Sequence, residues 1–213
     1  MILVDYSQIA IANIMQSARQ GVNEDMVRHM ILNTLRMYRN KFSDEYGELV
    51  LCCDNSNNWR KEIFEHYKAP RKVQREKSDF DWNNLFMILN NIRRELQETF
   101  PYKMVYIDHA EADDIIYMCS QKIRKNPDNI ISIISSDHDL LQIIDSSFNI
   151  KLYQGNLKTY NNKAKGNADI SNFLKAILGD SSDNIPKVFS GVGEKTAVKL
   201  YNNPNLLLDK FRK

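Results

Sequence analysis

Short and almost continuous apolar runs recur along the chain, and they predict five β-strands. The runs are rich in β-branched residues and bounded by polar ones, as in strands that are covered on both faces. They lie at residues 2–5, 48–54, 103–108, 129–135 and 149–153.

Between these runs, apolar residues recur about every 3.6 positions, which predicts amphipathic helices. Met26, Val27, Ile31 and Leu35 follow this spacing, and Asn23 is a suitable N-cap before them. The same spacing marks residues 81–100, 115–123, 168–178 and 193–201.

The alternation of strands and helices predicts the fold class. We expect an α/β domain at residues 1–165, with a mostly parallel central sheet and helices on both faces, followed by a helical segment at 166–213. With 43% hydrophobic residues, the chain can build a sizeable core. No apolar run approaches the roughly 20 residues that span a bilayer, so no membrane segment is expected.

The N-terminus and the cysteines indicate the compartment. The first residues, MILVDYSQIA, lack the basic region of a signal peptide. Cys52, Cys53 and Cys119 have no C-x-x-C spacing and are expected to be reduced thiols. We therefore expect a cytoplasmic protein.

Acidic residues follow four of the predicted strands. Asp5 and Asp54 end the first two strands, and five more follow the third and fourth: Glu111, Asp113, Asp114, Asp137 and Asp139. Ligands of open parallel sheets bind outside the carboxyl ends of the strands, so we expect these seven carboxylates to meet at one edge. A single acid at such a place is usually a turn or cap residue, or favours the helix dipole. Seven together would repel one another unless divalent cations joined them.

The type of these ligands narrows the choice of metal. Carboxylate oxygens alone suit Mg²⁺ or Mn²⁺ better than zinc. We expect two Mg²⁺ ions about 4 Å apart, with Mn²⁺ as a substitute, to bind a phosphate, activate a water and stabilise the leaving oxygen. A second acidic motif, GDSSDN, adds Asp180 and Asp183. By itself this motif is equally typical of an Asp-rich turn.

Two further segments suit nucleic acid. In SGVGEKT, Gly191 and Gly193 precede a predicted helix that carries Lys195 and Thr196. Backbone N–H groups at such a helix start can hold a phosphate without reading sequence.

The second segment is basic and covers residues 59–80, here named the basic arch. From Lys68 to Lys77 it has five basic residues and one acid, and Pro70 is expected to break its helix. Tyr67 followed by Lys68 suits a segment that stacks a base and neutralises phosphates. A solvated basic surface is the other explanation.

The distribution of charge adds to this picture. The net charge is only +2, but setting the nine acids aside leaves 18 acids against 29 Lys and Arg, a net charge of +11. An acidic cluster in a basic chain suits a polyanion that approaches metal ions. Dispersed charges on solvated helix faces would give the same totals, so composition alone leaves both explanations open.

Together these motifs resemble those of the structure-specific 5′-nuclease superfamily, which includes flap endonucleases and the 5′-nuclease domains of bacterial DNA polymerase I. Within it, the chain is particularly similar to the ribonuclease H of T-even bacteriophages. The segments that carry the resemblance span most of the chain: VDYSQIA, MVRHMILN, VLCCDN, YKAPR, EADD, SSDHDL and GDSSDN.

The resemblance implies a role for each acid. A second metal would be held by Asp180 and Asp183, with Asp114 in support. The first metal would be held, directly or through water, by Asp5, Asp54, Glu111, Asp113, Asp137 and Asp139.

The resemblance also implies nucleic-acid contacts. Lys68 and Arg75 would contact the scissile phosphate, Tyr67 would stack on a base, and Arg71 and Lys72 would add further contacts. A helix-three-turn-helix motif would grip duplex DNA, often with a potassium ion at its turn, through Gly191, Gly193, Lys195 and Thr196.

The chain departs from the family pattern in two places. Its turn KVFSGVG is bulkier than the usual turn before the Gly-x-Gly. The sequence also ends at Lys213, where related proteins usually continue with further helices.

The function implied is that of a flap endonuclease and 5′-3′ exonuclease acting on DNA or RNA–DNA by two-metal catalysis, and removing RNA primers in phage-type DNA replication. The expected state is a monomer, with a replication clamp or a single-strand-binding protein as further partners. A PIN-type endoribonuclease is an alternative that needs a similar acidic cluster but not the GDSSDN and GVGEKTA motifs. A DNA-end-binding protein without catalysis is another, although a binder gains nothing from carboxylates that face phosphate.

Overall fold

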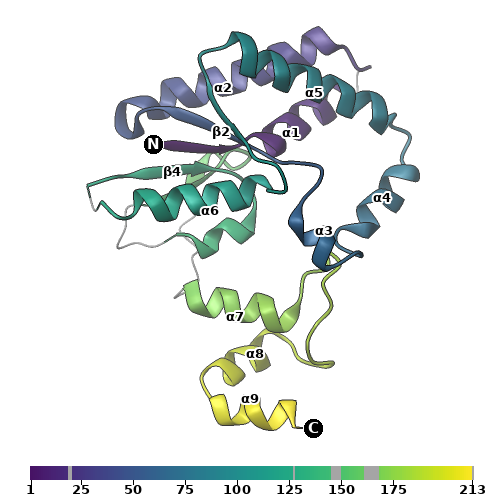
Figure 1. The fold of residues 1–213 in the computed structure, drawn as a ribbon, viewed down its shortest axis with the longest axis vertical. Coiled ribbons are helices and arrows are strands. Elements are labelled where there is room, and N and C mark those ends of the chain that lie inside the picture. Colours follow the sequence, from purple (N-terminus) through teal and green to yellow (C-terminus); the bar gives the residue numbers. More distant parts are fainter. Residues whose placement is uncertain (19–20, 127, 145–149, 161–167, 213) are drawn as a thin grey trace.

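The computed structural model describes residues 1–18, 21–126, 128–144, 150–160 and 168–212, and its centre is a six-stranded sheet (Figure 1). The strand order is β3-β2-β1-β4-β5-β6, with β6 antiparallel to β5 and every other pair parallel. The five predicted strands are confirmed, with ends shifted by at most about two residues. The strands are β1 (Ile2–Asp5), β2 (Leu49–Cys53), β3 (Lys103–Tyr106), β4 (Ile131–Ile134), β5 (Ile150–Gln154) and β6 (Thr159–Tyr160).

The direction of the strand order reverses at β1. The chain adds β2 and β3 on one side of β1 and then returns to add β4 on the other side. Val4 pairs with Leu51 of β2 and with Ile134 of β4, so the carboxyl ends of these three strands lie side by side. Such a reversal is where open α/β sheets bind their ligands.

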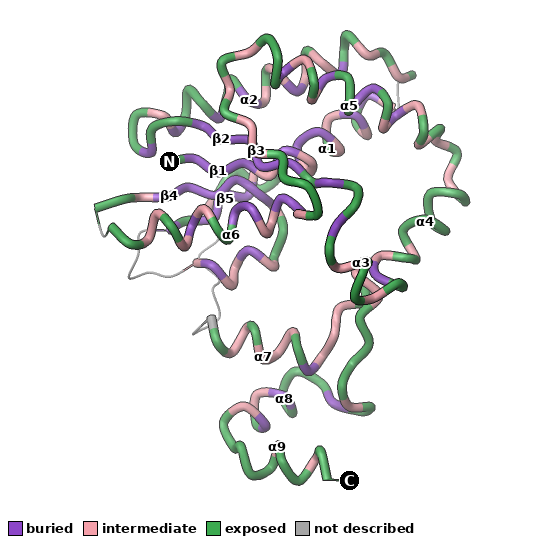
Figure 2. The backbone as a smooth tube through the Cα atoms, viewed as in Figure 1, coloured by how far each residue is buried: buried purple, intermediate pink, exposed green. Residues whose placement is uncertain are grey.

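Helices cover both faces of the sheet, as predicted. Figure 1 shows α1 (Tyr6–Ala18), α2 (Glu24–Tyr46) and α5 (Trp82–Thr99) on one side and α6 (Ala112–Ile123) on the other. Alternate residues of β1 enter the two cores: Ile2 and Val4 pack with α1, α2 and α5, whereas Leu3 packs with α6 and the short 3-10 helix η1 (His138–Gln142). β1, β2, β4 and β5 are mostly buried (Figure 2), whereas the edge strands β3 and β6 contain only exposed and partly buried residues.

Local sequence signals explain the starts of two helices. Asn23 caps α2 by accepting the Met26 N–H at 3.1 Å, which confirms the predicted N-cap. Asp81 caps α5 in the same way, accepting the Asn84 N–H at 3.0 Å. The sequence pattern missed α1, which starts directly after β1 with no turn between them and is rich in Ile, a residue with only moderate helix propensity.

The basic arch contains two short helices, α3 (Trp59–Ile63) and α4 (Ala69–Glu76). The prediction that Pro70 breaks the helix is wrong, because Pro70 lies in the first turn of α4. A proline costs no hydrogen bond there, since the first N–H groups of a helix have no partner within it. Neither helix buries a residue, and Figure 2 shows α4 as exposed.

The C-terminal helices form a layer beside the sheet domain (Figure 1). They are α7 (Ala168–Leu178), α8 (Glu194–Tyr201) and α9 (Pro204–Phe211), of which α9 was not predicted. Their small core contains Ile177, Val192, Ala197 and Leu200. The expected boundary at residue 165 lies outside the described residues. Within the described ranges, none of the helices is both long enough and apolar enough to cross a membrane.

Gly179 allows the chain to turn sharply after α7. Its φ is +67°, and a Cβ at this position would lie 2.4 Å from the backbone oxygen of Ile185. Asp180 and Ile185 exchange two backbone hydrogen bonds, at 2.9 and 2.7 Å, which close the turn 180–185. Only glycine combines this backbone conformation with so close an approach.

We predict that Gly179→Ala destabilises the turn, because it adds backbone strain and a steric clash, by about 2–4 kcal/mol in total. Hydrogen exchange of the Asp180 and Ile185 amides and thermal unfolding would measure the loss. Gly191→Ala is the matched control: its φ is +70°, but no atom lies within 4 Å of the added Cβ, so only about 1–2 kcal/mol of strain is expected. Equal effects of the two substitutions would contradict the steric argument.

Candidate active site

Three carboxylates surround the point where the strand order reverses. Asp5 ends β1, Asp54 follows β2 and Asp137 follows β4. Asp5 is partly buried and accepts the Ser135 hydroxyl at 3.0 Å and the Gln8 N–H at 3.2 Å. Burial and the neighbouring charges of Asp54 and Asp137 raise the pKa of Asp5 to about 7 despite these hydrogen bonds.

The start of α6 brings three more carboxylates to the same edge. Asp54 accepts the Ala112 N–H at 2.7 Å and so joins the end of β2 to the first turn of α6. Glu111 and Asp114 form a capping box, in which Asp114 accepts the Glu111 N–H at 3.0 Å. Burial raises the pKa of Asp113 to about 6, although Arg60 partly offsets this.

Glu111 is the most enclosed of these acids, with 7% of its surface exposed. Its carboxylate accepts the Tyr67 hydroxyl at 2.7 Å and the Lys68 ammonium at 2.8 Å, and Arg60 lies 3.1 Å away. Asn58 adds a donor at 3.4 Å. The first residues of the basic arch therefore converge on one carboxylate, which joins the arch to α6.

Arg60 binds Asp114 in a two-pronged ion pair. Its two terminal nitrogens lie 2.7 and 2.9 Å from the two Asp114 oxygens, and Asp113 is 3.6 Å away. Burial alone would raise the pKa of Asp114, but the hydrogen bonds from Arg60 outweigh it and lower that pKa. This geometry is the strong, planar form of an Arg–carboxylate pair.

Lys175 of α7 joins the two acidic motifs of the second half of the chain. Its ammonium pairs with Asp139 of η1 and with Asp180, the latter at 3.0 Å. Burial would raise the pKa of Asp180, but hydrogen bonds from Ser182 and Lys175 lower it to about 2. Asp137 accepts the Asp139 N–H at 2.8 Å and thereby fixes the start of η1.

The turn 180–185 is also bonded to the basic arch. Arg71 pairs with the Asp183 carboxylate at 3.0 Å, and the Lys68 N–H donates to the Asp183 carbonyl at 3.0 Å. Asn184 donates its side-chain N–H to the His66 carbonyl at 2.9 Å. Sequence segments more than 110 residues apart are thus held together at the acidic edge.

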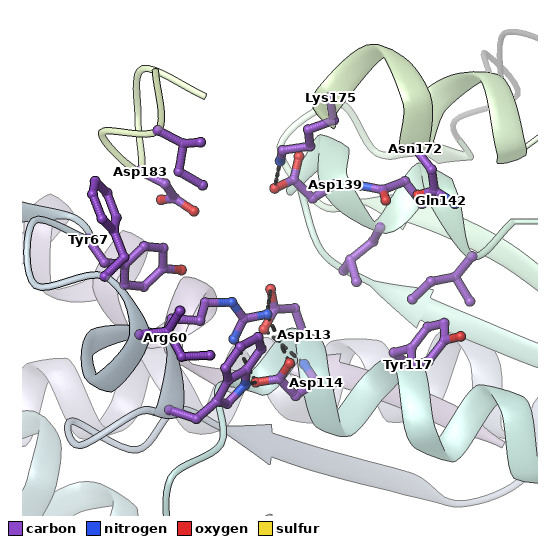
Figure 3. Close-up of a pocket in the computed structure, with 16 residues that line it drawn as sticks. Arg60, Tyr67, Asp113, Asp114, Tyr117, Asp139, Gln142, Asn172, Lys175 and Asp183 are labelled. Carbon is purple, nitrogen blue, oxygen red and sulfur yellow. Dashed lines mark hydrogen bonds and ion pairs between the residues drawn. The ribbon is translucent and has the colours of Figure 1, made fainter. Parts of the chain in front are cut away.

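These groups line a cavity of about 460 Å³, shown in Figure 3. Its walls come from α3, α6, η1, α7 and the turn 180–185. Asp113, Asp114, Asp139 and Asp183 all line it, together with Arg60 and Lys175. Among the described residues, no three His, Cys, Asp or Glu side chains are arranged to hold a metal ion. Glu111, Asp113, Asp114, Asp139, Asp180 and Asp183 instead pair with Arg or Lys side chains. Asp5, Asp54 and Asp137 accept backbone or hydroxyl hydrogen bonds.

The residues of the basic arch that were predicted to contact nucleic acid differ in their placement. Tyr67 is only 5% exposed, so no ring face is open for stacking. The Arg75 guanidinium lies over the rings of Trp82 and Phe86, at 5.4 and 4.8 Å, rather than beside the carboxylates. Lys72 is exposed on α4.

The residues of the predicted duplex-binding motif lie at the start of α8. Gly193 is its N-cap, and Gly191 has a positive φ of 70° just before it. Lys195 and Thr196 are exposed in the first turn. In Figure 1 this helix lies beyond α7 from the sheet, so the motif is separate from the acidic edge.

Sequence reasoning missed the residues that hold the carboxylates. Arg60 and Lys175 pair with five acids between them, and Trp59 donates its indole N–H to Asp114 at 3.3 Å. The only sequence signal for them is the pair Trp59-Arg60 at the start of the basic arch. Which acid a cation selects depends on long-range packing, so no local pattern reveals it.

Comparison with known proteins identifies relatives of the whole region described above. The family model of the 5′-3′ exonuclease N-terminal resolvase-like domain matches residues 2–171. The ribonuclease H of Enterobacteria phage T4 is 34% identical over 191 residues, covering 87% of this chain and 62% of that protein. A 5′-3′ exonuclease of Mycoplasmopsis pulmonis is 32% identical over 163 residues, covering 70% of this chain and 48% of the relative. The chain thus spans about half to two thirds of the length of these relatives.

Solved structures confirm the fold. The flap endonuclease of bacteriophage T5, in a complex with DNA and metal ions, superposes with a TM-score of 0.74 at 18% identity, covering 94% of this chain and 74% of that one. The T5 5′-exonuclease with bound zinc gives a TM-score of 0.73 at 17% identity, covering 95% of this chain and 74% of that one.

The family model matches most of the length of the chain. The chain therefore belongs to the 5′-3′ exonuclease family that carries the N-terminal resolvase-like domain.

Proposed function

We propose that the chain is a divalent-metal-dependent 5′-nuclease, which hydrolyses phosphodiesters of DNA or RNA–DNA at 5′ flaps and 5′ ends. The observation that carries the proposal is the acidic edge itself. Carboxylates from β1, β2, α6, β4–η1 and the turn 180–185 gather beside basic helices at the ligand-binding edge of a parallel sheet. The names of the relatives, 5′-3′ exonuclease and ribonuclease H, support the same reading.

The donor set fits Mg²⁺ or Mn²⁺. All donors are carboxylate oxygens, which these ions prefer. Burial raises the pKa values of Asp5 and Asp113 most, and the charges of neighbouring acids raise them further. A divalent cation removes that repulsion. We assign a second metal to Asp180 and Asp183, with Asp114 in support. We assign the first metal, directly or through water, to six acids: Asp5, Asp54, Glu111, Asp113, Asp137 and Asp139.

When bound, such metals lower the pKa of a coordinated water and stabilise the charge on the leaving oxygen. The chain's own cations then act on the substrate. The Lys68 ammonium lies 2.8 Å from Glu111. Once Glu111 has another positive partner, the Lys68 side chain can move so that its ammonium pairs with a phosphate oxygen. Arg75 would join it only if α4 rotated away from the rings of α5. Lys72 and Arg71 extend the same basic surface.

The C-terminal helices supply the grip on the duplex in this proposal. Gly191, Gly193, Lys195 and Thr196 present exposed N–H, ammonium and hydroxyl donors at the start of α8. These donors suit a phosphate backbone, and the carbonyls of the turn would suit a potassium ion. We further propose a monomer that removes RNA primers during phage-type DNA replication, with a clamp or single-strand-binding protein as partner.

We predict Mg²⁺-dependent cleavage of a duplex that carries a 5′ flap. Substrates labelled at either end should give products cut at or near the flap junction, and EDTA should stop the reaction. Asp139→Asn should lower the cleavage rate about 100-fold or more while binding persists, because Asp139 is proposed to hold the first metal, directly or through water. The measurement is product formation under single-turnover conditions.

Asp44→Asn is the matched control, since Asp44 is exposed near the end of α2, which leads into the amino end of β2. It should leave the rate unchanged. Cutting of single-stranded RNA without a duplex requirement would instead favour the PIN-type activity. Binding of flapped DNA with no product in Mg²⁺ or Mn²⁺ would favour a non-catalytic end-binding protein.

A second prediction concerns the electrostatic cost of the acids in the metal-free protein. Because the folded state raises the pKa of Asp5 from its ordinary value of 3.8 to about 7, the folded protein holds this proton more tightly. The cost of ionising Asp5 is therefore small at pH 4, grows between pH 4 and 7, and is complete above pH 7. Asp5→Asn should raise the free energy of unfolding by about 1–3 kcal/mol at pH 8 in EDTA.

Thermal or urea unfolding at pH 4 and pH 8 would measure this effect. At pH 4 the variant and the wild type should differ little. Mg²⁺ should stabilise the wild type at pH 8, because the ion neutralises the charge of the Asp5 carboxylate. It should have a weaker effect on the variant, which lacks that charge. A variant that is less stable than the wild type at pH 8 in EDTA would refute the electrostatic cost.

A further inference from the structure

The cavity beside the acids has an aromatic wall that the catalytic proposal does not use. Trp59 is 43% exposed and Tyr117 is 49% exposed, although both line the cavity. Ile63 and Phe64 continue this wall at the base of the arch. Large rings that remain exposed inside a cavity of this size are typical of a ligand-binding surface.

Trp59 is held in a fixed orientation. Its indole N–H donates to Asp114 at 3.3 Å, and the Arg60 guanidinium lies 4.8 Å from the ring centre. One face of the indole is thus covered by a cation, which leaves the other face for a ligand. Tyr67 offers no such face, because its ring is buried and its hydroxyl is bound to Glu111.

The other groups of the cavity narrow the ligand further. Arg60 and Lys175 supply positive charge beside the four carboxylates of the lining, three of which they bind. Asn172 and Gln142 supply amides that can both donate and accept hydrogen bonds (Figure 3). An aromatic platform with cations close by suits a base joined to phosphates. A base within a duplex has both faces covered by its neighbours, whereas an unpaired base leaves a face open to stack on a side chain.

We propose that this cavity binds an unpaired base of the 5′ single strand, stacked on Trp59, with Tyr117 as a second wall. The inference rests on the proposed nuclease function and identifies the part of the substrate that the cavity reads. Because Trp59 also contacts Asp114 and Arg60, a base bound there is placed directly beside the acidic cluster. Trp59 is therefore a positioning residue, which fixes the register of the strand relative to the carboxylates.

Tryptophan fluorescence tests the contact without any cleavage. The chain has two tryptophans, so Trp82→Phe leaves Trp59 as the only indole. Titration with a single-stranded oligonucleotide in EDTA should quench the emission of this variant, because stacked bases quench indole. Trp59→Phe, which leaves only Trp82, should show little change. Unquenched Trp59 emission, with the same oligonucleotide bound by anisotropy, would overturn the proposal.

Substitutions paired with abasic substrates test whether the contact is to a base. Trp59→Leu should weaken binding of the 5′ single strand about ten-fold, the loss expected from one stacked base, whereas Trp59→Phe should keep most of the affinity. In a series of substrates that each lack one base at a different flap position, the affinity of the wild type should fall by a similar factor at only one position. The affinity of Trp59→Leu should not fall further when the same base is removed. In a double-mutant cycle, such non-additive losses show that Trp59 and that base interact.

Tyr106→Leu is the matched control, since Tyr106 is 41% exposed on β3 and does not line the cavity. It should change neither affinity nor the abasic profile. If Trp59→Leu weakens intact and abasic substrates equally, Trp59 has only a structural role and the proposal is wrong. Failure of the wild type to cut flapped DNA would refute the nuclease function instead, and the fluorescence titration would still report on the base contact.

Discussion

The arrangement of the site depends on one buried carboxylate, Glu111. Burying an ionised carboxylate costs several kcal/mol unless cations and hydrogen-bond donors surround it. Tyr67, Lys68 and Arg60 meet that requirement, and all three come from the basic arch. Since α3 and α4 bury no residue of their own, it is this polar network, more than apolar packing, that fixes the base of the arch against the sheet domain.

The same principle attaches the C-terminal helices. Lys175 pairs with Asp139 and Asp180, and Arg71 pairs with Asp183, so α7 and the turn 180–185 meet η1 and α4 through charges. Ion pairs of this kind can exchange partners, which close-packed apolar contacts cannot do without opening the core. A phosphate or a divalent cation that enters the cavity competes for the same groups. In the proposed function, ligand binding would therefore be linked to the position of the arch and of the C-terminal helices.

The need to satisfy buried carboxylates also places Trp59 and Tyr67 of the basic arch in different environments. From the sequence, only Tyr67 was predicted to stack on a base, although Trp59 also stands next to a basic residue. The need to satisfy Glu111 draws the Tyr67 hydroxyl inward and buries its ring. The Trp59 indole instead remains at the cavity wall, fixed by Asp114 and Arg60.

The sequence by itself determined the five parallel strands β1–β5, the helices α2, α5, α6, α7 and α8, and the edge at which the acids lie. Strands that are covered on both faces appear as continuous apolar runs, as in β2 and β4, and helix burial has a period of 3.6. Caps such as Asn23 act within three residues, so all these features are local. The placement of Asp5 and Asp54 follows directly from the ends of their strands. Local patterns could not predict α1, whose helical state depends on packing against the sheet, or the position of Pro70 inside α4.

Only the tertiary structure decided which carboxylate each Arg or Lys side chain binds. Arg60 lies 54 positions from Asp114, and Arg71 lies 112 positions from Asp183, so no spacing along the chain reveals either pair. Burial decides such choices, because the cost of an unpaired charge is felt only after the chain has folded around it. The sequence therefore specified the acids and where they stand, and the fold assigned their partners, buried Tyr67 and left Trp59 facing the cavity.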